Sequence, residues 1–168
     1  MPKNTLEKDE IAIWDILKTI PDPEIPVISV VELGVIRKVE TSVEKTLITI
    51  TPTYSGCPAM KQIEDDIVSA LESNGFANAE IKMVFSPAWT TDWMNDVARE
   101  KLREYGIAPP QKGTNDKGVL FASGPKIVNC PQCNSEKTKL ISQFGSTACK
   151  AFYKCSTCQE TFDYFKCI

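Results

Sequence analysis

The chain has 168 residues, of which 42% are hydrophobic and 24% are charged, with 8 glycines and 11 prolines. This composition is globular and excludes a disordered or collagen-like chain. A chain of this length buries roughly 68 to 70% of its unfolded surface, so we expect a core that needs no disulfides. No segment has the pattern of a signal peptide or a membrane span, which predicts a soluble, cytoplasmic protein.

Charge is distributed unevenly along the chain. Residues 126–168 carry a net charge of +3 and residues 1–125 carry −6, which gives −3 in total. Histidine is absent from the sequence, which removes the commonest general base and the commonest nitrogen ligand for metals. Chemistry in this chain must therefore use thiolates, carboxylates or backbone groups.

Hydrophobic periodicity up to Gly106 predicts an α+β fold, with helices covering a small mixed sheet. The predicted elements, in chain order, are a helix that Asn4 and Glu7 can cap and Pro21 ends, strands over 35–40 and 47–51, a helix from Pro58 to Asn74, a strand over 80–85, and a helix that Thr90 or Thr91 can cap and Gly106 ends.

The segment after this helix has the composition of a linker. From Pro109 to Pro125 the chain contains three prolines, three glycines and few large apolar residues. We therefore expect an α+β domain over residues 1–109, a linker over 110–125 and a second module over 126–168.

The second module contains two CxxC pairs separated by 21 residues, Cys130 with Cys133 and Cys155 with Cys158. This spacing predicts two turns that give four thiolates to one tetrahedral ion, and zinc is the default metal for that ligand set. With strands expected over 139–144, 150–154 and 161–165, the module resembles a zinc ribbon. About 40 residues rarely fold unaided, so we expect the zinc to be structural. Tetrathiolate iron or a cluster uses similar spacing and stays open.

Two further cysteines of the tail, Cys149 and Cys167, exceed the needs of a four-coordinate ion. They are either small buried apolar residues or an accessory thiol pair that receives iron or sulfur.

The remaining cysteine, Cys57, follows a predicted strand and directly precedes the helix that Pro58 begins. Backbone N–H groups and the helix dipole lower the pKa of a thiol at such a position, so we expect a ready soft ligand or nucleophile. Acyl-transfer chemistry is not expected, because no histidine is present to act as the base of a cysteine-hydrolase dyad. An inert core cysteine is the alternative.

A stiff acidic loop lies before the first strand, where three prolines flank Asp22 and Glu24. These carboxylates could meet Cys57 across the sheet edge and add oxygen ligands beside its sulfur. Solvated turn residues are the simpler interpretation.

Two stretches resemble the MIP18 (DUF59) family of metal–sulfur cluster assembly factors over about residues 6–109. They are the run from Asp22 to Ile36 and the run Thr51-Pro52-Thr53 with Cys57-Pro58. Glu32 stands where that family usually has Asp, which keeps the charge but lengthens the side chain. The resemblance implies a functional thiol at Cys57, with Asp22, Glu24, Thr51 and Thr53 as its supporting loop residues.

The tail pattern from Cys130 to Cys167, joined to this domain, resembles the PaaD family of phenylacetate degradation. That resemblance implies a non-catalytic accessory factor of the multicomponent phenylacetyl-CoA epoxidase, with structural zinc and transiently bound iron or iron–sulfur cluster. Its implied partners are the epoxidase components or their reductase as client, and cluster scaffold proteins.

Two other functions are compatible with the sequence. One is a structural subunit that holds epoxidase components together. The other is a nucleic-acid-binding ribbon, suggested by lysines and aromatic residues of the tail, although modest basicity and an acidic main domain argue against it. No membrane partner is expected, and the sequence leaves a homodimer open.

Overall fold

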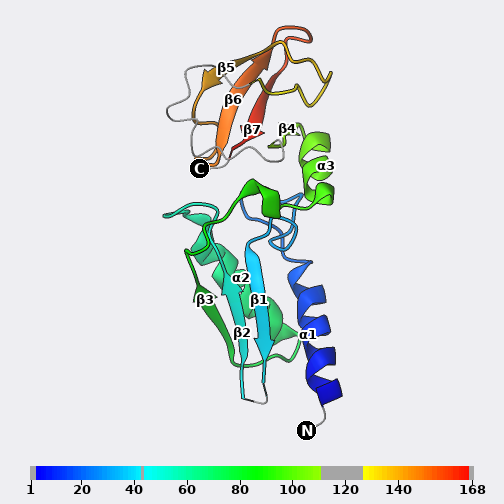
Figure 1. Cartoon of the computed structure of the whole chain (residues 1–168), viewed down its shortest axis with the longest axis vertical. Helices are drawn as coiled ribbons and strands as arrows, with labels where there is room; N and C mark the ends of the chain where they lie inside the picture. The colour runs from blue at the N-terminus through cyan, green and yellow to red at the C-terminus, as the bar shows by residue number, and fades with distance from the viewer. Residues whose placement is uncertain (1–2, 43, 111–126, 167–168) are drawn as a thin grey trace. The chain divides into compact units, whose positions relative to one another are not determined.

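The computed structural model describes residues 3–42, 44–110 and 127–166. Its contacts divide the chain into two compact units, residues 1–89 and residues 90–168. The first unit contains, in chain order, α1 (Lys3–Leu17), β1 (Ile36–Thr41), β2 (Thr46–Ile50), α2 (Ala59–Ser73) and β3 (Ala79–Met83) (Figure 1).

The sheet of the first unit is mixed, with the strand order β1-β2-β3. β1 and β2 form an antiparallel hairpin, whereas β2 and β3 are parallel. Parallel strands need a crossover, and α2 supplies it. The predicted small mixed sheet is therefore confirmed.

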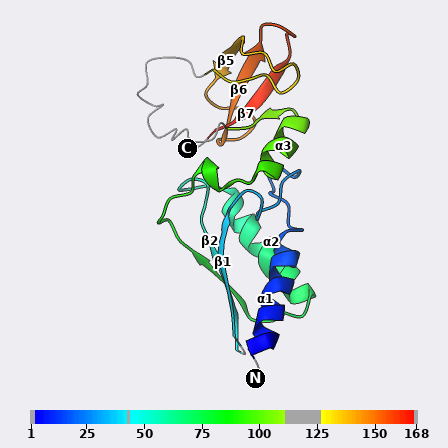
Figure 2. The same cartoon turned by 45° about the vertical axis from the view of Figure 1, so that its right-hand side comes forward.

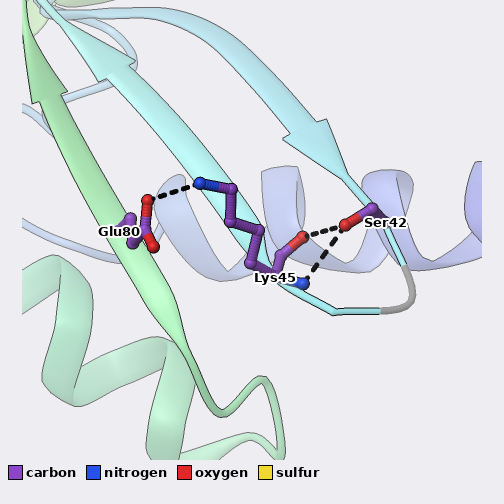
Figure 3. Close-up of polar contacts among 3 residues, drawn as sticks. All are labelled: Ser42, Lys45 and Glu80. Carbon is purple, nitrogen blue, oxygen red and sulfur yellow. Dashed lines mark hydrogen bonds and ion pairs between the residues drawn. The ribbon is translucent and has the colours of Figure 1, made fainter.

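The hairpin turn is closed by side-chain contacts at the end of the sheet where β1 ends (Figure 3). Ser42 Oγ donates to the carbonyl oxygen of Lys45 at 3.0 Å, and the backbone N–H of Lys45 donates back to Ser42 Oγ at 3.2 Å. Lys45 Nζ also lies 2.8 Å from a carboxylate oxygen of Glu80 on β3. These contacts link the turn to the third strand.

The core of the first unit lies between the sheet and the helices α1 and α2, which cover the same face of the sheet (Figure 2). α2 begins after Pro58, a proline that fits a helix start, and buries residues spaced four apart. The buried residues that form this core include Ile13, Leu17, Ile48, Ile50, Ile63, Ile67 and Leu71.

The second unit contains β4 (Ile107–Ala108), β5 (Thr138–Ser142), β6 (Lys150–Cys155) and β7 (Thr161–Phe165), which form a four-stranded sheet with the order β4-β7-β6-β5. Tyr153 is buried at its centre, stacked on Phe162 at 6.0 Å and edge-on to Tyr164 at 5.8 Å between ring centroids. The helices of this unit are the short 3-10 helix η1 (Thr91–Trp93) and α3 (Asp96–Glu104).

The last helix starts later than the sequence predicted. Thr90 caps η1 by accepting from the N–H of Asp92, and the cap of α3 is Asn95, whose Oδ1 accepts from the N–H of Ala98 at 2.7 Å. Met94 is extended and separates the two short helices. Two capping residues thus replace the one that we expected.

The division after Trp89 differs from the predicted domain limits of 1–109, 110–125 and 126–168. β4 pairs in parallel with β7, so α3 and β4 lie in the second unit. The buried guanidinium of Arg99 on α3 donates to the carbonyl oxygens of Thr91 and Pro110 in the same unit. Residues 111–125 of the predicted linker lie outside the described residues. Which segments fold alone stays a prediction.

Among the described residues, the structure contains no helix with the length and apolar character needed to cross a membrane.

Candidate functional site

The four cysteines of the two CxxC pairs come together at one end of the second sheet. The Sγ atoms of Cys130, Cys133, Cys155 and Cys158 all lie within 4.8 Å of one another. Cys130 Sγ is 3.7 Å from Cys158 Sγ, and Cys133 Sγ is 3.6 Å from Cys155 Sγ. The two CxxC turns therefore face each other, and each of these distances joins one cysteine of the first pair to one of the second.

The two CxxC turns have the same backbone construction. The N–H of Cys130 donates to the carbonyl oxygen of Ser135 at 3.0 Å, and the N–H of Cys155 donates to that of Glu160 at 2.8 Å. Each pair is followed by a residue in the left-handed conformation, Asn134 with a φ of 57° and Gln159 with a φ of 67°. Matching turns present their thiols symmetrically to a common point.

This donor set fits a single tetrahedral zinc ion. A Zn–S bond of about 2.3 Å places tetrahedral sulfur ligands about 3.8 Å apart. The two sulfur–sulfur distances of 3.7 and 3.6 Å match that spacing. A cluster would put several irons between the pairs and spread them further. The second unit therefore has the geometry of a structural metal centre.

The thiols of this centre differ in acidity. Backbone N–H donation, first from Cys158 and then from Thr157, lowers the pKa of Cys155 to about 6. Burial raises the pKa of Cys130. Metal binding must therefore displace protons from thiols in part of this site, whereas Cys155 is poised as a thiolate.

Of the two accessory cysteines, Cys149 is not part of this cluster. Cys149 is buried, 5% exposed, just before β6, whereas Cys155 ends that strand. The hydroxyl of Thr147 lies 3.0 Å from Cys149 Sγ. Cys167 lies outside the described residues. A thiol role for either residue stays a prediction.

Cys57 lies in the first unit, in the turn between β2 and α2. Its N–H donates to the carbonyl oxygen of Tyr54 at 3.2 Å, and its own carbonyl accepts from Met60 N–H at 3.3 Å. Gly56, with a φ of 93°, supplies the left-handed step that this turn requires. The Cys57 side chain is half-buried, so it is open to solvent on one side.

The acidic loop lies close enough to Cys57 for its two carboxylates to influence the thiol. Asp22 is 6% exposed, and its Oδ1 accepts from the N–H groups of Glu24 at 2.9 Å and Ile25 at 2.8 Å. The charges of Glu24 and Asp22 both act on the Cys57 thiol. Asp22 thus holds the loop in shape, while Glu24 is the more exposed carboxylate.

The expected acidity of Cys57 is wrong in sign. Burial is the largest influence and raises the pKa of the thiol above its usual value. The N–H of Ala59 and the side chain of Thr53 hydrogen-bond to the sulfur and act in the opposite direction, but Glu24 and Asp22 raise the pKa further. The helix start contributes as predicted, and burial with two nearby carboxylates outweighs it.

The other threonine of the predicted set, Thr51, has a structural position. It is 1% exposed, and its N–H donates to the carbonyl oxygen of Val35 at 2.9 Å. Its Oγ1 is buried and has no hydrogen-bond partner in the part of the chain that the structure describes. The structure therefore brings Asp22, Glu24 and Thr53 to Cys57, while Thr51 ties two loops together.

Sequence reasoning missed two contacts that support these loops. Ser29 and Glu32 cap each other reciprocally, with N–H to side-chain distances of 2.9 and 3.1 Å. Their i, i+3 spacing is that of a capping box and was visible in the sequence. Trp89 Nε1 donates to the carbonyl oxygen of Leu33 at 3.0 Å, a contact between distant residues that no local pattern could reveal.

Comparisons with known proteins match both units. A family model described as iron-sulfur cluster assembly protein matches residues 10–83, and one described as PaaD zinc beta ribbon domain matches residues 115–166. The chain is 51% identical over 156 residues to an Escherichia coli (strain K12) protein named as a putative subunit of 1,2-phenylacetyl-CoA epoxidase. That match covers 93% of this chain and 92% of the relative.

Two further similarities concern the N-terminal part of the chain. A Porphyromonas gingivalis protein named Fe-S protein maturation auxiliary factor is 35% identical over 101 residues, covering 59% of this chain and 95% of the relative. A crystal structure of a DUF59 domain from Bacillus anthracis has a TM-score of 0.57 and 28% identity, covering 60% of this chain and 97% of that domain.

Proposed function

Because the chain belongs to the PaaD family, which joins an iron–sulfur cluster assembly domain to a zinc ribbon, we propose that it is an accessory maturation factor. Its client is the multicomponent phenylacetyl-CoA epoxidase or the reductase of that system. Its task is to help load iron or an iron–sulfur cluster, and it does not itself catalyse the oxidation.

The observation that carries this proposal is the setting of Cys57. The half-buried sulfur offers one soft ligand to an incoming cation, and Glu24, the more exposed of the two carboxylates that influence it, offers oxygen. No histidine is available in the sequence to make a catalytic base or a carboxylate–histidine iron site. The chemistry best supported here is brief cation binding.

The exchange at Cys57 is a ligand substitution. The cargo cation displaces the thiol proton, which leaves to solvent, and a bond forms between the metal and Cys57 Sγ. A thiolate of the client then attacks the metal and the bond to Cys57 breaks, after which the sulfur takes up a proton again. The raised pKa of Cys57 favours this release, because a proton competes well for the sulfur.

The zinc ribbon of the second unit would have a structural role. Cys130, Cys133, Cys155 and Cys158 would hold the zinc ion, which cross-links the two turns and supplies no redox chemistry. The second unit then offers a stable surface to the client or to a scaffold protein.

The test is the loading of the epoxidase system by a Cys57→Ser variant. We expect this variant to fold, since the substitution changes one half-exposed atom, but to leave the client short of iron or cluster. The matched control is Ser55→Ala, an exposed substitution in the same turn, which should load the client normally. Full loading by Cys57→Ser would defeat the proposal.

A second function, a structural subunit of the epoxidase, is favoured by one observation. The Escherichia coli relative is named as a subunit of that enzyme. In this case Cys57→Ser would be silent, whereas loss of the four-cysteine centre would prevent assembly of the complex. Sedimentation of the complex with each variant distinguishes the two functions.

A further inference from the structure

The sheet of the second unit carries its core on one face and exposes the other face to solvent. Tyr153 on β6 belongs to the buried cluster, and Leu140, its partner on β5, packs against that cluster. Side chains alternate across a strand, so the residues next to these two point the other way. Lys139 on β5 and Lys154 on β6 are both exposed and therefore share the outer face.

These two lysines lie directly opposite each other. Lys139 and Lys154 are Cα partners in the antiparallel register of β5 and β6. In the part of the chain that the structure describes, neither side chain forms an ion pair. Like charges directly opposite across two strands destabilise a sheet. The pair therefore does not stabilise the fold, and it presents two ammonium groups that an anionic partner can neutralise.

Apolar side chains continue the outer face along the same two strands. The β5–β6 register shifts between Leu140 and Ser142, so that Ile141 and Ser142 together lie opposite Phe152 on β6. Ile141 is 53% exposed, and Phe152 is partly exposed. An apolar surface thus follows the lysine pair directly.

The loop after β5 adds an aromatic side chain to the same face. Asp163 on β7 lies opposite Phe152, and the hydroxyl of Ser146 donates to Asp163 Oδ2 at 2.9 Å. The backbone of Gly145 packs on the same carboxylate, since a Cβ on it would lie 2.3 Å from Asp163 Oδ1. These contacts place the preceding residue, Phe144, on the outer face, where it is 67% exposed. The outer ribbon patch, as we call it, consists of Lys139, Ile141, Phe144, Phe152 and Lys154.

From these features we infer that the outer ribbon patch docks a segment of the client in which aspartate or glutamate side chains flank apolar ones. The two lysines select carboxylates, and the apolar residues of the patch supply the area that is removed from water. This inference rests on the proposed function, which gives the ribbon a surface for the client but does not say where that surface lies.

The patch fits a polypeptide better than a nucleic acid. Residues 127–166 contain no arginine, the side chain that pairs best with phosphate. Lys166 Nζ lies 4.5 Å from the centroid of the Phe144 ring, so one face of that ring is covered and is not free to stack on a base. The carboxylate of Asp163 on the same face would also repel phosphates.

The first experiment measures the dissociation constant between the full chain and the purified epoxidase components over a range of salt concentrations. A double variant, Lys139→Gln with Lys154→Gln, should bind about tenfold more weakly and lose most of the salt dependence. Its melting temperature should not fall, because the change removes a like-charge pair. The matched control is Lys8→Gln with Lys82→Gln, two exposed lysines of the first unit, which alters net charge equally and should bind like wild type.

The second experiment tests the apolar part of the patch with the same binding measurement. Phe144→Ser should weaken binding about tenfold, because it removes the most exposed apolar side chain of the patch. The matched control is Ile11→Ser, which removes an apolar side chain of α1 that is 63% exposed and should leave binding unchanged.

The outcomes separate this inference from the proposed function. The patch is wrong if its variants bind like wild type, if the controls weaken binding equally, or if a short DNA duplex displaces the client. A loss of loading in Cys57→Ser would still support the function in those cases. If the patch variants bind weakly while Cys57→Ser loads the client fully, the patch stands as an assembly contact and the transfer function fails. No binding by the wild-type chain overturns both.

Discussion

The two units use cysteine in opposite ways. In the second unit, four thiols from matched turns converge within 4.8 Å, and Cys130 and Cys155 are buried. In the first unit, a single half-buried thiol is accompanied by Thr53 and two carboxylates. Four converging sulfurs fit permanent binding of one ion, whereas a single sulfur with a raised pKa fits the brief binding that we propose for Cys57.

The largest effect should come from removing one ligand of the four-cysteine metal centre. Cys155→Ser removes one of the four thiol ligands, so we expect the bound metal to fall from about one ion per chain to none. Structural zinc contributes on the order of 10 kcal/mol to small domains. The melting transition of the second unit should therefore be lost in calorimetry, while that of the first unit remains.

A control for this prediction is Cys149→Ala, which removes a tail thiol that lies outside the cluster. Metal analysis should find its zinc unchanged. Equal metal loss in both variants would show that the tail binds its ion in some other arrangement.

A smaller effect is expected from a change in the acidic loop near Cys57. Asp22→Ala removes a buried carboxylate that accepts two backbone N–H groups. Leaving these donors unsatisfied should cost about 1 to 3 kcal/mol of unfolding free energy. Urea denaturation of the full chain, monitored by tryptophan fluorescence, measures this loss. Asp22→Asn should recover part of it, since its side-chain oxygen can still accept.

The smallest predicted effect is a change in the pKa of Cys57 alone. Glu24 raises the pKa of Cys57, so Glu24→Gln should lower that pKa and increase the thiolate fraction near neutral pH. Alkylation by iodoacetamide should then become a few-fold faster, with little change in stability. Thr53→Val should do the reverse, because the Thr53 hydrogen bond lowers the pKa. If both variants alkylate at the wild-type rate, these groups do not tune the thiol.

Local sequence patterns predicted the elements and the metal centre well. The CxxC spacing placed four cysteines together because each turn is a local structure and the antiparallel strands β5 and β6 between the pairs return the chain. The hairpin and α2 followed from alternation and from Pro58. The cap of α3 was missed because Thr90, Thr91 and Asn95 are all good capping residues, and tertiary contacts choose among them.

Two features could not be predicted from local patterns. They are the direction of the Cys57 pKa shift, which depends on burial, and the position of β4, which depends on pairing with a distant strand. The sign of the Cys57 pKa shift follows from how deeply the thiol is buried, and no spacing encodes that depth. The position of β4 follows from its pairing with β7, more than fifty residues away. Composition therefore suggested a linker after Pro109, although the strand just before it belongs to the second sheet.

The pairing of β4 with β7 has a practical consequence for work with fragments. Ala108 shares the buried cluster of Tyr153, Phe162 and Tyr164. A fragment that starts at residue 127 would keep all four zinc ligands but would uncover the backbone of β7 next to Asp163 and Tyr164. Open strand edges of this kind template aggregation. Expression from Thr90 onward would retain the protecting strand and keep the isolated ribbon monodisperse.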